Sequence, residues 1–303
     1  MKTNAERARE QLTLMPKTEF TLERDGFIGA LYQLERNEYP GKAIIMFSGS
    51  DGIYSLTKLV AEQYVKRGMT VLALAYWNEP GLPDCFEKVP VELVEKAALW
   101  LSSHSFEKVG LWGISMGAEL ALLAGSLMPE LISCVTAVCP TNICSQGFAK
   151  KKSIQLECSA FSWRGEELPW VRLKFSKASI LRDSLRERSV CLRSCYEDAV
   201  LHAPEEAQIK VENIGGPVLL LYPEYDAMWP SELSAGKIRT RLKEKNFAYP
   251  CKCFTYKYAS HMLAPVKSRS TVMFRVERKY PKQCWESDMD AFEKTLAFWK
   301  EVW

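Results

Sequence analysis

Residues 109–124 read VGLWGISMGAELALLA, and this stretch decides the fold. The apolar run at its start is typical of a buried strand, and the strong helix formers at its end predict a helix. Between them Gly113 and Gly117 flank Ser115, as in the sharp strand-to-helix turn that presents a nucleophilic serine. The structural alternative is a serine in a βα turn that only packs. The flanks favour the first interpretation, because unpaired N–H groups at the helix start would face developing negative charge.

The chain has three histidines, and one of them is well placed to serve Ser115 as a base. In enzymes built around this turn, the acid and the histidine follow the serine. His104 precedes Ser115, and His202 lies in a polar segment ahead of the last strands. His261 follows the apolar run 250–256, which predicts the final strand. Position and elimination therefore both indicate His261, although a lone histidine is often only structural.

The acid is expected on the loop after residues 217–222, a continuous apolar run that predicts a strand buried on both faces. Asp226 is the candidate and Glu224 the alternate. The carboxylate would hold one imidazole tautomer and stabilise the imidazolium. A structural alternative is an N-cap, in which Asp226 or Ser231 opens the helix predicted over 232–245. Both roles are compatible with one loop.

Two backbone N–H groups are needed to bind the oxyanion that forms on the attacked carbonyl. The N–H of Met116, directly after the serine, is the first candidate. The second is expected on the loop 48–52, which reads SGSDG and follows the predicted strand 43–47. Ser50 N–H is the choice, with Gly49 as the alternative. The competing interpretation of this loop is an ordinary βα connection.

Strands and helices alternate along most of the chain, which predicts a mostly parallel sheet with helices on both faces. Besides the elements already given, the pattern predicts strands at 70–75 and 134–138 and helices at 55–67 and 90–103. Residues 18–34 alternate as a strand pair does, with Asp25-Gly26 as a turn signal. We expect one α/β domain over 18–303, preceded by a helical or flexible segment at 1–17.

Residues 141–213 interrupt this alternation and are too long for a plain connection. Between residues 150 and 193 there are eleven Lys or Arg and five Asp or Glu. The segment also holds four aromatic residues, Phe161, Trp163, Trp170 and Phe175. One interpretation is a cap over Ser115 whose aromatics line an apolar pocket and whose cations, Arg172 and Lys174 among them, attract an anionic substrate. The alternative is a solvated basic surface on a structural excursion.

Composition limits the classes of protein that need to be considered. The net charge of +3 is too small to suggest nucleic-acid binding, and no apolar run approaches the length of a membrane span. The ten cysteines contain no C-x-x-C pair, so we expect reduced, mostly buried thiols and no metal or cofactor. The N-terminus lacks a secretory signal, which favours a cytoplasmic location. The oligomeric state is left open.

These motifs resemble the C-terminal catalytic domain shared by acyl-CoA thioesterases and bile acid-CoA:amino acid N-acyltransferase. The similarity runs from about residue 18 to the C-terminus. It rests on FSGSDG at 47–52, LALAYWN at 72–78 with Leu82-Pro83, GLWGISMGAEL at 110–120, Asp226 with Trp229-Pro230-Ser231, and His261. The resemblance implies an α/β-hydrolase fold of the dienelactone hydrolase-like type, with a cap insertion. It also implies Ser115, Asp226 and His261 as the catalytic triad.

The chain departs from the family pattern at two places. Animal members carry an N-terminal β-sandwich, whereas roughly forty residues precede the first core strand here. The segment after Pro265 aligns poorly and is crowded with basic residues, including Arg269, Arg275, Arg278 and Lys279. In the family a cysteine nucleophile goes with transfer to an amino acid and a serine with hydrolysis, so Ser115 favours hydrolysis.

The expected function is hydrolysis of an acyl thioester, an acyl-CoA above all, by a serine hydrolase that forms an acyl-enzyme. The alternatives within the same chemistry are a carboxylesterase and an acyl-CoA N-acyltransferase, because the second nucleophile decides between them. A non-catalytic ligand-binding protein is a third possibility. It is disfavoured because all three triad residues stand at fitting positions.

Overall fold

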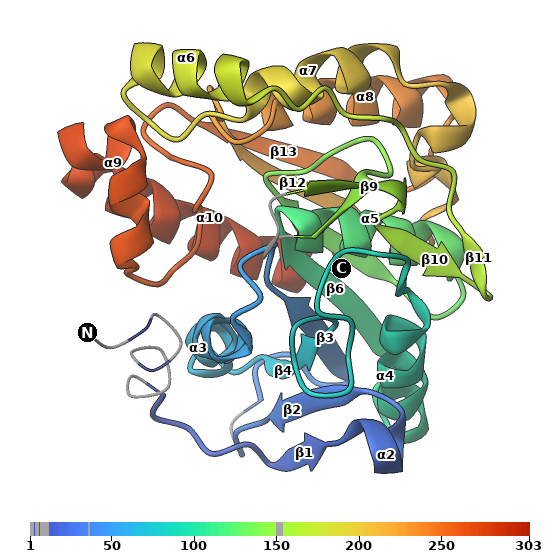
Figure 1. Ribbon diagram of the computed structural model, residues 1–303. Coiled ribbons are helices and arrows are strands. Elements are labelled where there is room, and N and C mark those ends of the chain that lie inside the picture. The colour runs from blue at the N-terminus through green and yellow to red at the C-terminus, as the bar shows by residue number, and fades with distance from the viewer. Residues whose placement is uncertain (1–2, 4–5, 7–11, 36, 150–153) are drawn as a thin grey trace.

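The computed structural model describes residues 3, 6, 12–35, 37–149 and 154–303. Within them the chain forms a large twisted sheet with helices packed on both of its faces (Figure 1). The segment predicted at 1–17 lies mostly outside the described residues. The predicted α/β-hydrolase architecture is confirmed, and the core strands and helices begin and end within a few residues of their predicted bounds.

The order of strands in the large sheet shows how the chain is wound. Across the described part of the chain the order is β1 (Thr18–Phe20), β2 (Ile28–Tyr32), β4 (Thr70–Ala75), β3 (Lys42–Phe47), β6 (Lys108–Ile114), β7 (Cys134–Val138), β12 (Val218–Pro223) and β13 (Cys251–Tyr256). β2 runs antiparallel to both of its neighbours, and the other pairs are parallel. The carboxyl ends of β6, β12 and β13 therefore lie along one edge of the sheet.

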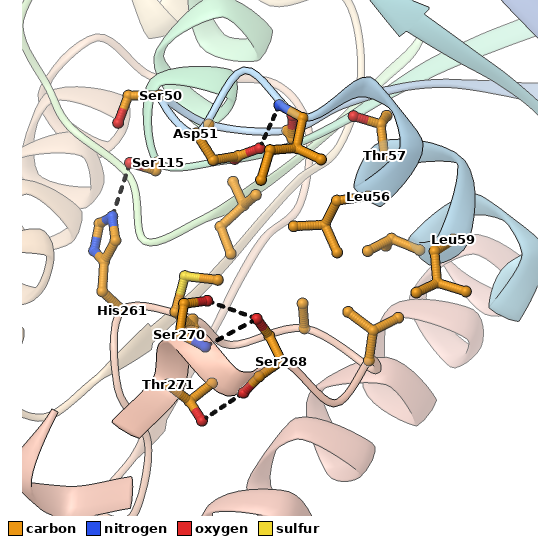
Figure 2. A pocket seen from close by; sticks show the side chains of 18 of the residues that line it. Ser50, Asp51, Leu56, Thr57, Leu59, Ser115, His261, Ser268, Ser270 and Thr271 are labelled. Atoms are coloured by element: carbon orange, nitrogen blue, oxygen red, sulfur yellow. Dashed lines mark hydrogen bonds between the residues drawn. The ribbon is translucent and has the colours of Figure 1, made fainter. Parts of the chain in front are cut away.

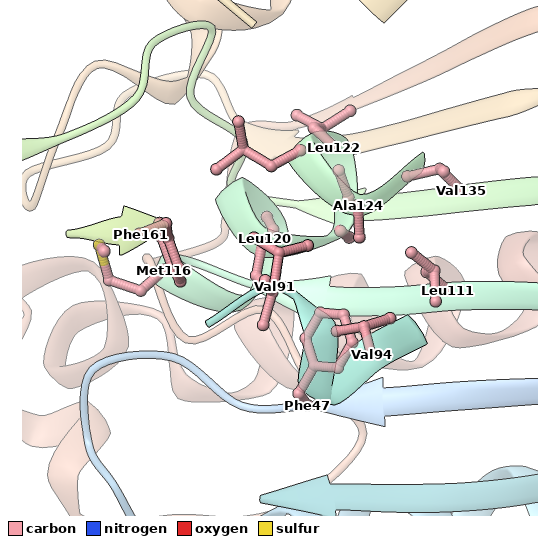
Figure 3. Packing of buried hydrophobic residues seen from close by; sticks show 14 of the residues in the cluster. Phe47, Val91, Val94, Leu111, Met116, Leu120, Leu122, Ala124, Val135 and Phe161 are labelled. Atoms are coloured by element: carbon pink, nitrogen blue, oxygen red, sulfur yellow. The ribbon is translucent and has the colours of Figure 1, made fainter. Parts of the chain in front are cut away.

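Helices bury both faces of this sheet. The main ones are α3 (Tyr54–Val65), α4 (Glu92–Ser103), α5 (Met116–Leu127), α8 (Ser231–Glu244) and α10 (Pro281–Glu301). Along β3 alternate side chains enter opposite layers: Ile45 belongs to the buried layer that also contains residues of α4, α5 and α8, and Ile44 belongs to the layer that contains residues of α3 and α10. Figure 3 shows Leu120 and Ala124 of α5 packed against the first of these layers.

The excursion 141–213 has local structure of its own. It contains β8 (Gln146–Ala149), β9 (Ile154–Ser159), β10 (Phe161–Trp163), β11 (Glu166–Glu167), α6 (Lys177–Glu187), α7 (Arg193–His202), and the 3-10 turns η2 (Glu205–Ala207) and η3 (Val211–Asn213). β8 and β9 pair with each other, and β10 pairs with both β11 and the short β5 (Val89–Pro90). The pairing of β10 with β5, a strand that lies outside the excursion, thus joins the excursion to the rest of the domain.

Several smaller elements were not predicted from sequence. A short helix, α2 (Leu22–Asp25), precedes the turn at Gly26, whose φ of +75° fits the predicted turn. After β13 come η4 (Arg269–Met273), α9 (Arg275–Lys279) and the long α10. All ten thiols are free. Among the described residues no helix has both the length and the apolar character that a membrane crossing requires.

Candidate active site

Ser115 occupies a turn that only its two flanking glycines permit. It connects β6 to α5 and has φ +59° and ψ −126°, a strained conformation for a residue with a side chain. A Cβ on Gly113 would lie 2.0 Å from the carbonyl oxygen of Gly117, and one on Gly117 would lie 2.4 Å from the carbonyl oxygen of Ser48. The close approach of these backbones therefore requires glycine at both positions and presents the Ser115 side chain at the end of β6.

Three side chains far apart in sequence meet at this edge of the sheet. His261 Nε2 lies 2.7 Å from Ser115 Oγ, and His261 Nδ1 lies 2.7 Å from Asp226 Oδ2. Asp226 is fully buried and His261 is 6% exposed. Figure 2 shows the imidazole of His261 directed at Ser115. The predicted hydrogen-bond geometry of the three residues is present, within the range that proton transfer requires.

The carboxylate of Asp226 is held by the loop that carries it. Its Oδ1 accepts from the N–H of Met228 at 2.9 Å, and its Oδ2 accepts from Ser231 Oγ at 2.8 Å. α8 begins at Ser231, and Pro230 at its N-cap makes no side-chain capping bond. The N-cap alternative is therefore not realised, and Asp226 instead closes a local turn and faces His261.

Trp229 supports the imidazole from a second direction. Its ring meets that of His261 edge to face, with centroids 5.6 Å apart and an interplanar angle of 85°. Its Nε1–H donates to the carbonyl of Cys139 at 3.0 Å. The loop after β12 thus orients the histidine both by hydrogen bonding and by aromatic packing.

The other sequence candidates lie elsewhere. His104 is exposed and stacks on Trp100, and His202 is exposed and bonds Asp198 at 3.2 Å. Glu224 is exposed on the loop before Asp226. The fold therefore brings neither His104 nor His202 to Ser115, and it does not bring the alternate acid there either.

Cys139 stands beside these residues and was not anticipated from sequence. Three atoms lie within 4.8 Å of one another: Cys139 Sγ, a ring nitrogen of His261 and a carboxylate oxygen of Asp226. Thiol, imidazole and carboxylate groups are all side chains that can bind a metal. The ring nitrogens and the carboxylate are, however, engaged in the hydrogen bonds described above. Burial and the neighbouring Asp226 raise the pKa of the Cys139 thiol well above its usual value. The neutral thiol donates to the carbonyl of His261 at 3.5 Å, so we assign it a packing role.

A pocket of about 610 Å³ opens beside Ser115 and His261. One wall is α3 with the residues before it, 53–60. The opposite wall is formed by residues 262–274, which follow the histidine and which we call the strap. Figure 2 shows Leu56 and Leu59 projecting from α3 and the hydroxyls of Ser268 and Thr271 on the strap side. The two walls are far apart in sequence and meet only in the fold.

The predicted lining of this pocket by aromatics of the excursion was wrong. Phe161 is fully buried and packs near Tyr76 and Phe86, and Trp163, Trp170 and Phe175 pack against the main core. Among the described residues the excursion contributes Val190 alone to the lining. The physical reason is that these rings bury their apolar surface in the main hydrophobic core, Phe161 against Tyr76 and Phe86, and so do not line the pocket.

Glu119, one turn after Ser115 on α5, is a buried carboxyl that links the site to the excursion. It is fully buried and accepts from Ser145 N at 2.7 Å and from Ser145 Oγ at 2.6 Å. Burial raises the pKa of Glu119 to about 8, although the hydrogen bonds from Ser145 lower the pKa in part. The carboxyl therefore remains protonated at neutral pH.

This burial predicts a pH dependence of stability. Because the pKa of Glu119 is higher in the folded than in the unfolded chain, the free energy of unfolding should fall as pH rises from about 4.5 to about 8. Glu119→Gln imitates the protonated form and should lose stability less steeply over that window. Urea unfolding at pH 5, 6.5 and 8 measures the two slopes. Burial also raises the pKa of Asp288 to about 8. This residue is present in both proteins, so the difference between their slopes isolates Glu119. Equal slopes would contradict the assignment.

The strand-to-helix turn at Ser115, the sheet and the hydrogen-bonded Ser–His–Asp arrangement define the class of α/β hydrolases. Solved structures with the same fold include an α/β-hydrolase enzyme from a deep-sea metagenome library, with TM-score 0.56 and 14% identity over 94% of this chain and 96% of that one. A dienelactone hydrolase-like phosphotriesterase from metagenomic libraries gives TM-score 0.52 and 11% identity over 92% and 95%.

The particular family follows from sequence. Residues 89–276 match the family described as BAAT/acyl-CoA thioester hydrolase C terminal, and the chain belongs to it. It is 28% identical to acyl-coenzyme A thioesterase 2, mitochondrial, of Mus musculus over 264 aligned residues. The alignment covers 86% of this chain and 53% of that protein. It is also 28% identical to acyl-coenzyme A thioesterase 1 of Homo sapiens over 234 residues, and this alignment covers 76% of this chain and 50% of that protein. The chain spans about half the length of the curated relatives it matches.

Proposed function

We propose that this protein hydrolyses acyl thioesters, with acyl-CoA as the substrate, through a catalytic triad of Ser115, His261 and Asp226. The observation that carries the proposal is the continuous hydrogen-bonded chain from Ser115 Oγ through the His261 ring to Asp226, 2.7 Å at each step, beside a largely apolar pocket. Membership of a thioester hydrolase family supports the choice of thioester over other acyl substrates.

The geometry supports an acyl-enzyme mechanism. Ser115 Oγ attacks the thioester carbonyl while His261 Nε2 accepts its proton. The tetrahedral intermediate expels the thiolate, which takes up the proton that His261 accepted, and the acyl group is left esterified to Ser115. A water molecule then attacks, again giving a proton to His261, and the carboxylic acid leaves as Ser115 is restored. Asp226 keeps Nδ1 protonated and stabilises the imidazolium throughout.

The oxyanion is assigned to the N–H groups of Met116 and Ser50. Met116 is the first residue of α5, so its N–H has no partner within the helix. A Cβ on Gly49 would lie 2.8 Å from Ser115 Cβ, so this loop runs beside the nucleophile. The Gly49 carbonyl accepts from Tyr76 Oη and Trp77 Nε1, each at 3.3 Å. Because C=O and N–H of one trans peptide point oppositely, Ser50 N–H points away from those rings, which supports its role.

The acyl chain is assigned to the α3 wall of the pocket. Ile53, Leu56, Leu59 and Val60 line it at helical spacing. The stretch from residue 53 to residue 60 rises about 10 Å along the helix. An extended chain of about eight carbon atoms has a similar length, given carbon–carbon bonds of about 1.5 Å in a zigzag. We therefore expect a medium-length acyl group.

Filling the pocket at Leu56 should shorten the preferred chain. Leu56→Trp places an indole where the chain would pass, and each methylene kept out of the pocket should lower kcat/KM roughly fourfold. Activity on the shortest acyl groups should persist. Steady-state kinetics over acyl-CoAs of increasing length measure the change. Leu99→Trp, on the half-exposed face of α4, is the matched control and should leave the profile unchanged. An unaltered profile in Leu56→Trp would remove the chain from this wall.

A substrate comparison tests the function itself. Release of free thiol from acyl-CoA should greatly exceed hydrolysis of a p-nitrophenyl ester with the same acyl group. Adding glycine or taurine should not divert the acyl group to an amide. A preference for the oxygen ester would favour a carboxylesterase, and amide formation would favour an N-acyltransferase.

A further inference from the structure

Two basic side chains of the strap line the pocket without acidic partners. Lys267 and Arg269 are both exposed and both belong to the lining. Over the residues that the structure describes, neither forms an ion pair, and Lys267 Nζ instead lies 5.2 Å from the centroid of the Trp285 ring. Asp51, the acidic residue in the same lining, belongs to the loop before α3 on the opposite wall, where it accepts from the N–H of Ile53 at 2.7 Å.

The two cations flank a single residue of the strap. Ser268, which separates them, is extended, with φ −125° and ψ +138°, and both cations line the same pocket. Hydrogen bonds fix this turn: Ser268 Oγ lies 2.6 Å from Ser270 Oγ, and Thr271 Oγ1 donates to the Ser268 carbonyl at 2.9 Å. Figure 2 shows these bonds on the strap, below His261. The result is an ordered, positively charged edge beside the nucleophile.

Two cations of the excursion, in contrast, are neutralised on the surface. Arg172 forms an ion pair with Glu157, and Lys174 lies 2.8 Å from Asp198. Neither residue lines the pocket. Arg172 and Lys174 are therefore not the cations that face the substrate pocket, and among the described residues the positive charge in its lining comes from the strap.

We propose that Lys267 and Arg269 form an anion subsite that binds the phosphate groups of the CoA leaving group while the acyl chain lies along α3. The assignment rests on the proposed thioesterase function. Phosphates attract such cations strongly, and an Arg with a Lys can bind several phosphate oxygens at once. The apolar wall and the charged edge then bind the acyl chain and the CoA phosphates of one substrate at opposite walls of the pocket.

The test compares two substrates that share an acyl group and differ in phosphate. Acyl-CoA and the S-acyl-N-acetylcysteamine thioester are assayed with wild type and with Lys267→Gln/Arg269→Gln. KM for acyl-CoA should rise roughly fivefold to tenfold, the size expected for two exposed charge contacts, with no change for the phosphate-free thioester. Arg172→Gln/Lys174→Gln removes the same charge from the excursion and should change neither KM.

A binding measurement keeps this result separate from catalysis. Calorimetry measures the affinity of free CoA for the Ser115→Ala protein with and without the two strap substitutions. The strap substitutions should lower this affinity by a matching factor. Without them, the affinity should weaken as salt is added. An equal rise of KM for both thioesters, or unchanged CoA affinity, would overturn the subsite. Absence of thioester hydrolysis with intact, strap-dependent CoA binding would overturn the proposed function and keep the subsite.

Discussion

Replacing Ser115 with alanine is expected to lower kcat by several orders of magnitude, because the acyl-enzyme then has no oxygen to form on. The fold should remain, since alanine keeps the Cβ in the same tight turn and removes only the hydroxyl that bonds His261. Thiol release from acyl-CoA measures the loss, and thermal unfolding checks the fold. More than a tenth of wild-type activity in a folded variant would rule out Ser115 as the nucleophile.

A labelling experiment provides the control for that variant. A fluorophosphonate should modify wild type and leave Ser115→Ala unlabelled. Labelling of the alanine variant at a different serine would show that another side chain is the activated nucleophile.

Replacing Asp226 with asparagine should lower kcat by about four orders of magnitude. The carboxylate accepts from His261 Nδ1, Met228 N and Ser231 Oγ. An asparagine can keep the bond from Met228 through its oxygen, which turns its NH2 group toward the ring. The imidazole must then carry its proton on Nε2, where it cannot accept the proton of Ser115. Steady-state kinetics on acyl-CoA measure the loss.

Glu224→Gln is the matched control for the acid. This residue lies two positions earlier on the same loop and is exposed, so its amide should leave kcat within about twofold of wild type. A large loss in Glu224→Gln together with near-normal activity in Asp226→Asn would transfer the acid role to Glu224.

The elements that place the proposed triad could be predicted because their signals are local. Buried parallel strands appear as continuous apolar runs such as 217–222, and the glycines around Ser115 have a steric reason that the structure confirms. The three histidines were few enough for position to separate them. Hydrogen bonding between Ser115, His261 and Asp226 then follows from the common edge at which parallel strands end.

The pocket could not be predicted because its walls meet only through the tertiary fold. Residues 53–60 and the strap are separated by about two hundred residues. The apolar spacing on α3 was visible, but a lining helix and a core helix have the same pattern. The prediction for the aromatics of the excursion failed for a related reason: composition does not tell whether Phe161 lines a pocket or packs in the core against Tyr76 and Phe86. Ion pairing, which neutralises Arg172 and Lys174, is likewise decided by the fold.

The most direct test of the central claim is mass spectrometry of the enzyme quenched within the first turnovers on acyl-CoA. A mass increase equal to the acyl group less one hydrogen is expected on the peptide that contains Ser115, and it should be absent from Ser115→Ala. An acyl group found instead on a cysteine such as Cys139, or steady turnover with no acylated peptide under conditions that trap one in an established serine hydrolase, would contradict it.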